Sequence, residues 1–474
     1  MERMELKKNE MLELTITGTT HDGSGVGRTR ESMVVFVPAA AEGELVRAQV
    51  LRVGKGQAFA KLREVLRPSP ARVEPDCPVF SQCGGCAFRH LAYEEELRLK
   101  RARVRDALQR IAGLPLEPEE ILGSERMDFY RNKAEYPVGF DREGRLAAGF
   151  YAPHSHRIVP VQTAEGGPGC RLQPPAFGEL VQTVLRWMKR NAVPPYDEET
   201  GRGLVRHIYI RQAGGELLLC LIVNAEGGNI PAAQEFVRAA RGATLPDGAR
   251  LGGIVLNYNA ARTNVILGPR CETLWGKGRL AETLGGVKFE ISPLSFFQVN
   301  TRQAERLYTL AAEFAALGGN GRLLDLYCGT GTIGLFLARG VPEGLRAGEL
   351  VGVETVPQAV EDARRNAAAN GIPNARFLCA DAGQAAARLL SEGFSPDAVV
   401  VDPPRRGCDD AAVDAVAGLA PARIVYISCD PATLARDLKK FGQKGYFCAR
   451  VKPVDMFPRT PHVETVVLMS RVKD

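Results

Sequence analysis

The chain has 474 residues, of which 45% are hydrophobic and 24% charged, and it carries a net charge of +6. This composition is typical of a folded, water-soluble protein and excludes a disordered chain or a bundle of membrane helices. A single hydrophobic core seldom grows beyond about 250 residues, so the length predicts two or three domains. The mild basic excess permits a nucleic-acid partner without requiring one.

The N-terminal segment MERMELKKNEM alternates charges and lacks the apolar stretch of a secretion signal. We therefore expect a cytoplasmic protein that does not associate with a membrane. In a reducing compartment, the 11 cysteines should serve as thiols, metal ligands or catalytic groups rather than form disulfides.

Residues 11–66 contain short apolar segments separated by glycine turns, notably HDGSGVGR at 21–28. This pattern predicts a small antiparallel β-barrel of the OB-like kind over residues 1–68. Such barrels often bind single-stranded nucleic acid, although a purely structural barrel has the same pattern. The proline-rich segment at 67–78 then marks a domain boundary.

Three cysteines follow in CPVFSQCGGC, namely Cys77, Cys83 and Cys86, and Cys170 is a distant candidate for a fourth ligand. A structural zinc ion usually takes two close pairs of ligands, whereas only one C-x2-C pair is present here. A four-iron four-sulfur cluster tolerates the uneven spacing. On spacing alone, both groups stay open.

A basic helical segment is expected over residues 93–120. A solvated helix face and a phosphate-binding face explain its charges equally well. The surrounding residues 69–290 are interpreted as a mixed α+β central domain whose detailed fold the pattern does not reveal. The basic side chains of the helix are those of Arg98, Lys100, Arg101, Arg103, Arg105 and Arg110.

From residue 291 to 474, apolar strands alternate with helices, beginning with RLLDLYC and ending with an apolar segment after residue 463. This alternation predicts a doubly wound, Rossmann-like parallel sheet, and hence an α/β fold with a ligand site at the carboxyl ends of the strands. The glycines of DLYCGTGTIG at 325–334 match the dinucleotide-binding spacing, so a nicotinamide cofactor stays open for this motif alone.

Acidic residues after successive strands favour S-adenosylmethionine over a nicotinamide cofactor. Glu354 can accept hydrogen bonds from the ribose of either cofactor. Asp325 suits an ammonium group but would repel a pyrophosphate. Asp381 can reach the adenine, although each of these acids would also serve as a helix cap.

Two further segments carry groups suited to catalysis. Asp402 begins DPPRRG, in which two prolines stiffen the backbone, and Cys429 lies between an apolar strand and a helix that starts near Pro431. The positive end of that helix should make the Cys429 thiol easier to ionise. Glu464 begins the final apolar strand, which predicts that its carboxylate shares a cleft with Cys429.

Together, SFFQVN (295–300), DLYCGTGTIGL, DPPRRG, YISCDPATLARDL (426–438) and FPRTPHVE (457–464) resemble the RNA uracil-5-methyltransferase family, and the likeness spans nearly the whole chain. That family includes the tRNA enzyme for the T-loop uridine and the bacterial 23S ribosomal RNA enzymes. The resemblance implies that the N-terminal barrel is a TRAM domain and that the helix near 93–120 packs back on the catalytic domain. We expect the protein to act on structured RNA as a monomer.

The resemblance also assigns roles to individual residues. Cys429 corresponds to the nucleophile, Glu464 to the general base, and Phe296 is our candidate for stacking on a flipped uracil. Iron–sulfur members share the cysteine arrangement, which favours a four-iron four-sulfur cluster on Cys77, Cys83, Cys86 and Cys170. The residues expected to bind S-adenosylmethionine are Gln298, Tyr327, Glu354, Asp381 and Asp402.

Two positions depart from the family pattern. Many members have Asn where this chain has Asp430, and Gln, His or Tyr where it has Arg459. These departures put contacts with the RNA in doubt more than the chemistry.

The expected activity is formation of 5-methyluridine. Addition of the Cys429 thiolate to carbon 6 makes carbon 5 nucleophilic, and Glu464 removes the carbon 5 proton after methyl transfer. We expect 23S ribosomal RNA as the substrate, because the TRAM-like barrel and the cluster cysteines accompany the ribosomal branch of the family. The alternatives are the tRNA T-loop uridine, an RNA cytosine-5-methyltransferase, and a non-catalytic RNA-binding iron–sulfur protein.

Overall fold

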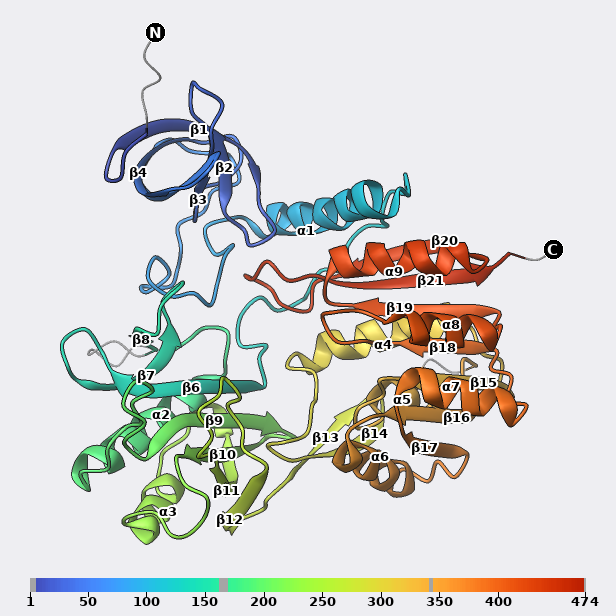
Figure 1. The fold of residues 1–474 in the computed structure, drawn as a ribbon. Helices are drawn as coiled ribbons and strands as arrows, with labels where there is room; N and C mark the ends of the chain where they lie inside the picture. The colour runs from blue at the N-terminus through green and yellow to red at the C-terminus, as the bar shows by residue number, and fades with distance from the viewer. Residues whose placement is uncertain (1–5, 162–168, 341–343, 473–474) are drawn as a thin grey trace.

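The N-terminal part of the protein is a closed five-stranded barrel, drawn in blue in Figure 1. The computed structural model describes residues 6–161, 169–340 and 344–472. Apolar side chains alternate along the strands and fill the barrel interior, which leaves the polar side chains outside. The strands are β1 (Met11–Thr19), β2 (Gly25–Arg28), β3 (Val34–Val37), β4 (Leu45–Val53) and β5 (Gln57–Arg67).

The segment 21–28, expected to be a turn, continues into strand β2 at Gly25. The reason is a close approach between backbones, since a Cβ atom at Gly25 would lie 2.7 Å from the carbonyl oxygen of Ala40. Glycine here therefore permits strand pairing rather than ending it.

Helix α1 (Tyr93–Ala107), with the π-helical turn η1 (Leu108–Ala112), is shorter than the expected helix of 93–120. Pro115 and Pro118 lack the N–H groups that a longer helix needs, so the chain continues extended beside strand β20 (Tyr446–Val454). Helix α1 contacts helix α9 (Pro431–Gln443) and strand β20, and Figure 1 shows it between the barrel and the C-terminal sheet.

A buried ionic network fixes α1 to the C-terminal part of the chain. The ammonium group of Lys100 lies 2.7 Å from carboxylate oxygens of both Glu96 and Asp455, and all three residues are at most 1% exposed. Tyr93 donates a hydrogen bond of 2.7 Å to Asp455. Paired in this way, the buried charges hold the segment after β20 in one position.

The central part is a seven-stranded sheet, in the order β12-β11-β10-β9-β6-β7-β8, that is covered on one side by two helices. The helices are α2 (Pro175–Arg190) and α3 (Ala233–Arg241), with a 3-10 turn η2 (Pro246–Gly248). The strands are β6 (Lys133–Phe140), β7 (Leu146–Tyr151), β8 (Ile158–Pro160), β9 (Val205–Ala213), β10 (Glu216–Val223), β11 (Arg250–Tyr258) and β12 (Arg270–Gly276).

The C-terminal part is the expected doubly wound sheet, in the order β17-β16-β15-β18-β19-β21-β20. Its strands are β15 (Gly321–Leu326), β16 (Ala347–Glu354), β17 (Ala375–Cys379), β18 (Ala398–Val401), β19 (Arg423–Ser428), β20 and β21 (Glu464–Arg471). Strands β15 to β19 are parallel, whereas β21 is antiparallel to both its neighbours. The start of β21 therefore lies beside the carboxyl end of β19.

Helices pack on both faces of this sheet (Figure 1), which gives the two clusters of buried side chains expected of a doubly wound fold. They are α4 (Thr301–Ala315), α5 (Thr332–Arg339), α6 (Pro357–Ala369), α7 (Ala382–Ser391), α8 (Asp410–Gly418) and α9. Among the described residues, no helix combines the length and apolar character needed to span a bilayer.

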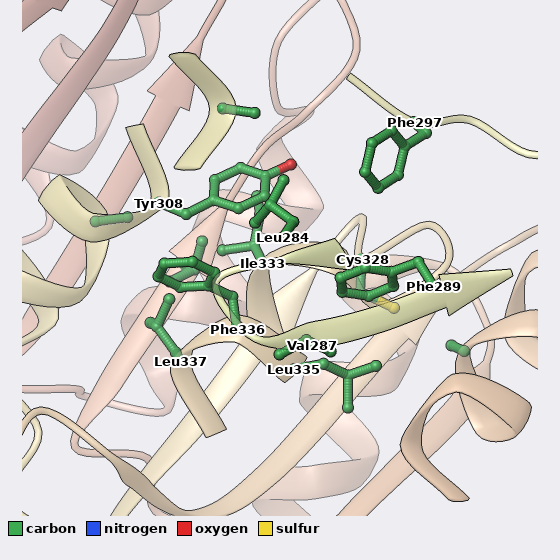
Figure 2. Packing of buried hydrophobic residues seen from close by; sticks show 14 of the residues in the cluster. Leu284, Val287, Phe289, Phe297, Tyr308, Cys328, Ile333, Leu335, Phe336 and Leu337 are labelled. Carbon is green, nitrogen blue, oxygen red and sulfur yellow. The ribbon is translucent and has the colours of Figure 1, made fainter. Parts of the chain in front are cut away.

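A hairpin of β13 (Leu280–Leu284) and β14 (Val287–Ile291) connects the two large sheets. Figure 2 shows its side chains Leu284, Val287 and Phe289 packed with Tyr308 of α4 and Phe336 of α5. The same cluster contains Tyr209 and Leu218 of the central sheet, so the hairpin joins the two sheets through one continuous core. The proposed boundaries at residues 68 and 290 stay predictions.

Candidate functional site

A cleft of about 640 Å³ opens at the carboxyl ends of the parallel strands. Strand ends are the expected ligand site of such a sheet, because the strand order reverses between β15 and β18. The structure brings the residues that the family resemblance assigns to catalysis and to the cofactor into this one cleft, together with Phe296, which is 67% exposed. They are Gln298, Tyr327, Glu354, Asp381, Asp402, Cys429 and Glu464.

The glycine turn after β15 forms one wall of the cleft. Asp325 lies beneath it, fully buried, and accepts a hydrogen bond of 2.8 Å from the Gly334 N–H. A Cβ atom at residue 334 would approach that carboxylate to 2.7 Å, which explains the glycine. Burial raises the pKa of Asp325 to about 8. One carboxylate oxygen of Asp325 thus supports the turn, and the expected contact with an ammonium group stays a prediction.

Glu354 and Asp381 occupy the ends of the next two strands. The Glu354 carboxylate accepts hydrogen bonds from the N–H groups of Gly329 (3.1 Å) and Val356 (2.9 Å), which orients it along the cleft wall. Asp381 caps helix α7 through the Gly383 N–H at 2.9 Å. Asp381 therefore serves as a helix cap while it also lines the cleft.

Two further acids line the cleft, the half-buried Asp402 and the buried Glu464. Burial raises the pKa of Asp402 to about 7. Glu464 is 6% exposed. Its burial and the nearby charge of Asp402 raise the pKa of Glu464 to about 8, although the Arg405 guanidinium acts to lower it. Both carboxyl groups therefore change protonation state near neutral pH.

Cys429 follows strand β19, and Glu464 begins the adjacent strand β21. The two residues are neighbours in space because Ser428 of β19 pairs with Thr465 of β21. The expectation that the helix start favours the thiolate is wrong for this conformation. Burial and the charges of Glu464 and Asp402 together raise the pKa of Cys429 to about 11. Desolvation is the largest of these causes, while the Arg405 guanidinium acts in the opposite direction.

The two departures from the family pattern have structural roles. Asp430 caps helix α9 by accepting hydrogen bonds of 2.9 Å from the N–H groups of Ala432 and Thr433, as an asparagine would also do. Arg459 points away from the cleft, with its guanidinium donating to the carbonyl oxygen of Leu91 at 3.2 Å.

The cleft also contains Arg405 and His462, which sequence reasoning did not single out, and Arg131, whose basic segment FYRNKAEY is compatible with phosphate contact or with a solvated face. Within the described chain, the buried Nε of Arg131 has no hydrogen-bond partner. Burial and the nearby Arg405 charge lower the pKa of His462 to about 4, so this imidazole is neutral. All three stand inside or beside the motifs of the sequence, but their convergence depends on the fold.

The four predicted ligand cysteines line a second cavity, of about 390 Å³. Burial raises the pKa of Cys86 to about 11 and that of Cys170 to about 12. In the described residues, no group of three or more His, Cys, Asp or Glu side chains is arranged to hold a metal ion. The structure thus gathers Cys77, Cys83, Cys86 and Cys170 around one cavity without forming a compact single-ion site.

Comparison with known proteins gives matches along the whole chain. Residues 286–472 match the tRNA (uracil-5-)-methyltransferase family, and residues 5–62 match the TRAM domain. An uncharacterized RNA methyltransferase of Clostridium tetani is 40% identical, with 99% of this chain and 98% of that protein covered. One from Listeria monocytogenes is 41% identical, with 99% of each chain covered.

Among solved structures, the tRNA (uracil-54, C5)-methyltransferase of Pyrococcus abyssi, in complex with S-adenosyl-L-homocysteine, is similar over 96% of this chain and 99% of that one. Its TM-score is 0.75 at 27% sequence identity. The likeness therefore extends over the barrel, the central sheet and the C-terminal sheet.

Proposed function

The chain belongs to the RNA uracil-5-methyltransferase family, and on that premise we propose that it methylates carbon 5 of a uridine in 23S ribosomal RNA through a covalent cysteine adduct. It is an S-adenosylmethionine-dependent RNA methyltransferase. The observation that carries the proposal is the meeting of Cys429 and Glu464 in one cleft with the cofactor-site acids.

The side of the cleft that is formed by the glycine turn would bind the cofactor. Glu354, already oriented by backbone N–H groups, would accept hydrogen bonds from the ribose hydroxyls. Asp402 supplies a carboxylate for a positively charged ligand, with Gln298 and Tyr327 as neighbouring contacts. S-adenosylmethionine supplies the methyl group on a sulfonium centre, and its positive charge would favour ionised forms of these acids.

The catalytic side of the cleft holds the nucleophile and the base. Cys429 would lose its thiol proton to solvent and add to carbon 6 of the uracil, which makes carbon 5 the nucleophile for the methyl group that S-adenosylmethionine would supply. Glu464 would then accept the proton from carbon 5, and elimination would restore the uracil double bond and return the cysteine as a thiolate. The exposed ring of Phe296 offers a surface for stacking on a base that has left its RNA stack. Arg131 and Arg405 give the cleft positive charge near the acids, which suits an RNA substrate.

A tRNA substrate is the second candidate. It is favoured by the similarity to the Pyrococcus abyssi enzyme, which acts on uracil-54 of tRNA and matches this chain almost from end to end. The TRAM-like barrel accordingly does not decide between the two RNAs.

The proposed activity is tested by incubating the protein with methyl-labelled S-adenosylmethionine and unmodified 23S ribosomal RNA or tRNA transcripts. We expect 5-methyluridine in the digested ribosomal RNA, identified by mass spectrometry of nucleosides. Label in tRNA alone would replace the ribosomal assignment by the second candidate. Label on cytosine would make the protein a cytosine-5-methyltransferase, and the absence of label in either RNA would contradict the function.

The activity should depend on pH through the buried acids. Glu464, with a pKa of about 8, and Asp402, with a pKa of about 7, must lose their protons to act as base and cofactor ligand. Because their pKa values are raised, the active carboxylates are present at high pH and are lost as the pH falls. We expect kcat/KM to rise roughly twentyfold between pH 7 and 9, about tenfold from Glu464 and about twofold from Asp402, with a further rise from ionisation of the Cys429 thiol. A profile that is flat over this range would contradict Glu464 as the base.

We also propose that Cys77, Cys83, Cys86 and Cys170 hold a four-iron four-sulfur cluster. The donor set fits, because four thiols line one cavity and such a cluster takes one thiolate on each iron. A structural role is expected, since methyl transfer moves no net electrons.

A further inference from the structure

Helix α9, which begins just after Cys429 (Figure 1), carries a fully buried acid. Asp437 is 0% exposed, and one oxygen of its carboxylate accepts hydrogen bonds from the Cys408 N–H at 2.8 Å and the Tyr426 hydroxyl at 2.7 Å. The other oxygen accepts a hydrogen bond of 2.9 Å from the Arg436 guanidinium. A buried carboxylate needs several such partners to offset the loss of water, so its position is strongly constrained.

The partners of this acid belong to two segments that form the catalytic cleft. Tyr426 lies on β19, the strand that leads to Cys429. Cys408 ends the turn 402–408, which follows β18 and supplies one wall of the cleft. The buried acid therefore fixes this turn against the strand that carries the nucleophile.

Arg436 and Asp437 also hold the turn by its backbone. The Arg436 guanidinium donates to the carbonyl oxygens of Arg406 at 2.7 Å and Cys408 at 3.5 Å. Between these two residues, Gly407 has a φ of 77°, and a Cβ atom there would collide with the Asp437 carboxylate. Only glycine permits both this backbone conformation and this close approach.

The turn carries a charge that acts on both reacting groups. The Arg405 guanidinium lowers the pKa of Glu464 and of Cys429, against the larger effect of burial, and Asp402 acts in the opposite direction. Asp402 directly follows β18, which is paired with β15 and β19, so displacement of the turn should move Arg405 more than Asp402. Outside the turn, the other charged or imidazole groups that line the cleft are held by other elements and are those of Arg131, Glu354, Asp381, Asp409 and His462.

We propose that Arg436 and Asp437 are positioning residues, which keep Arg405 beside the nucleophile and the base of the catalytic cleft. This inference rests on the proposed function. Among the described residues that line the cleft, neither Arg436 nor Asp437 is found, so the pair acts through Arg405 rather than on the substrate. A carboxylate is required at residue 437, because an asparagine offers one acceptor and one donor in place of two acceptors.

The test measures alkylation of Cys429 by iodoacetamide at pH 9, followed by mass spectrometry of the peptide that contains this residue. Only the thiolate reacts, so a higher pKa slows the reaction. Asp437→Asn and Arg436→Ala should each slow alkylation between about fivefold and tenfold, because loss of one nearby positive charge raises a pKa by about 1. A purely structural loosening of the turn would expose the thiol and speed the reaction instead.

Arg405→Gln provides the reference for this effect. It removes the charge directly and should slow alkylation by a similar factor. Asp437→Asn added to Arg405→Gln should cause no further slowing, because the charge that it displaces is already absent. In methylation assays, kcat/KM of Asp437→Asn should fall more at pH 7 than at pH 9, because the raised pKa of Glu464 rises further and the active carboxylate is lost as the pH falls.

The matched control is Glu44→Gln in the N-terminal barrel. Glu44 is also 0% exposed and accepts hydrogen bonds of 2.8 Å from the Ala41 N–H and from the Arg72 guanidinium. This variant should leave the alkylation rate of Cys429 unchanged. If Asp437→Asn does not fold, Arg436→Ala decides, because the Arg436 side chain is 43% exposed and its loss leaves the core intact.

Unchanged or faster alkylation in the folded variants of the pair would overturn the proposal. Equal slowing by Glu44→Gln, or further slowing by Asp437→Asn in the Arg405→Gln background, would also overturn it. Alkylation needs no turnover, so slowed alkylation in a protein that forms no 5-methyluridine would support the positioning pair and reject the function. Unchanged alkylation with intact methylation would do the reverse.

Discussion

Glu464→Gln should convert the enzyme into one that accumulates methylated RNA attached to Cys429. Glutamine has nearly the shape of glutamate but cannot take the carbon 5 proton, so elimination should stop after methyl transfer. The substitution also removes a negative charge that raises the pKa of Cys429, so addition to carbon 6 should not be impaired. A denaturing gel of labelled RNA should show a slow band that depends on S-adenosylmethionine, with turnover reduced at least about a hundredfold.

Cys429→Ala is the control for the same experiment. It should abolish both turnover and the slow band, because no thiol remains to add to the uracil. Calorimetry should still detect cofactor binding by this variant, which separates loss of chemistry from loss of folding. Turnover of Glu464→Gln at the native rate would exclude Glu464 as the base, and an active Cys429→Ala protein would exclude the covalent mechanism.

Anaerobically purified protein should contain about four irons per chain and show a broad brown absorbance. Cys83→Ser should remove most of the iron and lower the melting temperature. A structural reason for the second effect is that the N–H groups of Ala87 and Phe88, next to Cys86, donate to the carbonyl oxygen of Arg459 at 2.9 and 3.2 Å. The cysteine loop is thereby joined to the segment that leads into Glu464.

The matched control is Cys271→Ser, which changes an exposed cysteine on β12, outside the cavity. It should retain iron, colour and melting temperature. Stoichiometric zinc without iron in the native protein would contradict the cluster. Iron retained by Cys83→Ser would contradict the assignment of this ligand.

The sequence by itself determined the class of the C-terminal fold and the identity of the catalytic candidates. Apolar strands that alternate with helices leave few arrangements other than a doubly wound sheet. Residues just after such strands must meet at one edge, which is why the order of strands and helices alone places Glu354, Asp402 and Cys429 in one site. These inferences use local periodicity and one topological rule.

The sequence could not indicate the length of the basic helix or its surroundings. The helix ends at Ala112 rather than 120, and its Lys100 is not a solvated charge but the centre of a buried network with Glu96 and Asp455. The partner Asp455 is 355 residues away in the chain, and no periodicity within the helix can reveal such a contact.

The protonation of the site was decided only by the tertiary structure. A helix start predicts an easily ionised Cys429, yet burial beside Glu464 and Asp402 raises its pKa to about 11. The pKa of a side chain depends on all the groups that surround it in space, and most of these groups are distant in the sequence. For the same reason, the convergence of Arg131, Arg405 and His462 on the cleft depends on how the parts of the chain pack together.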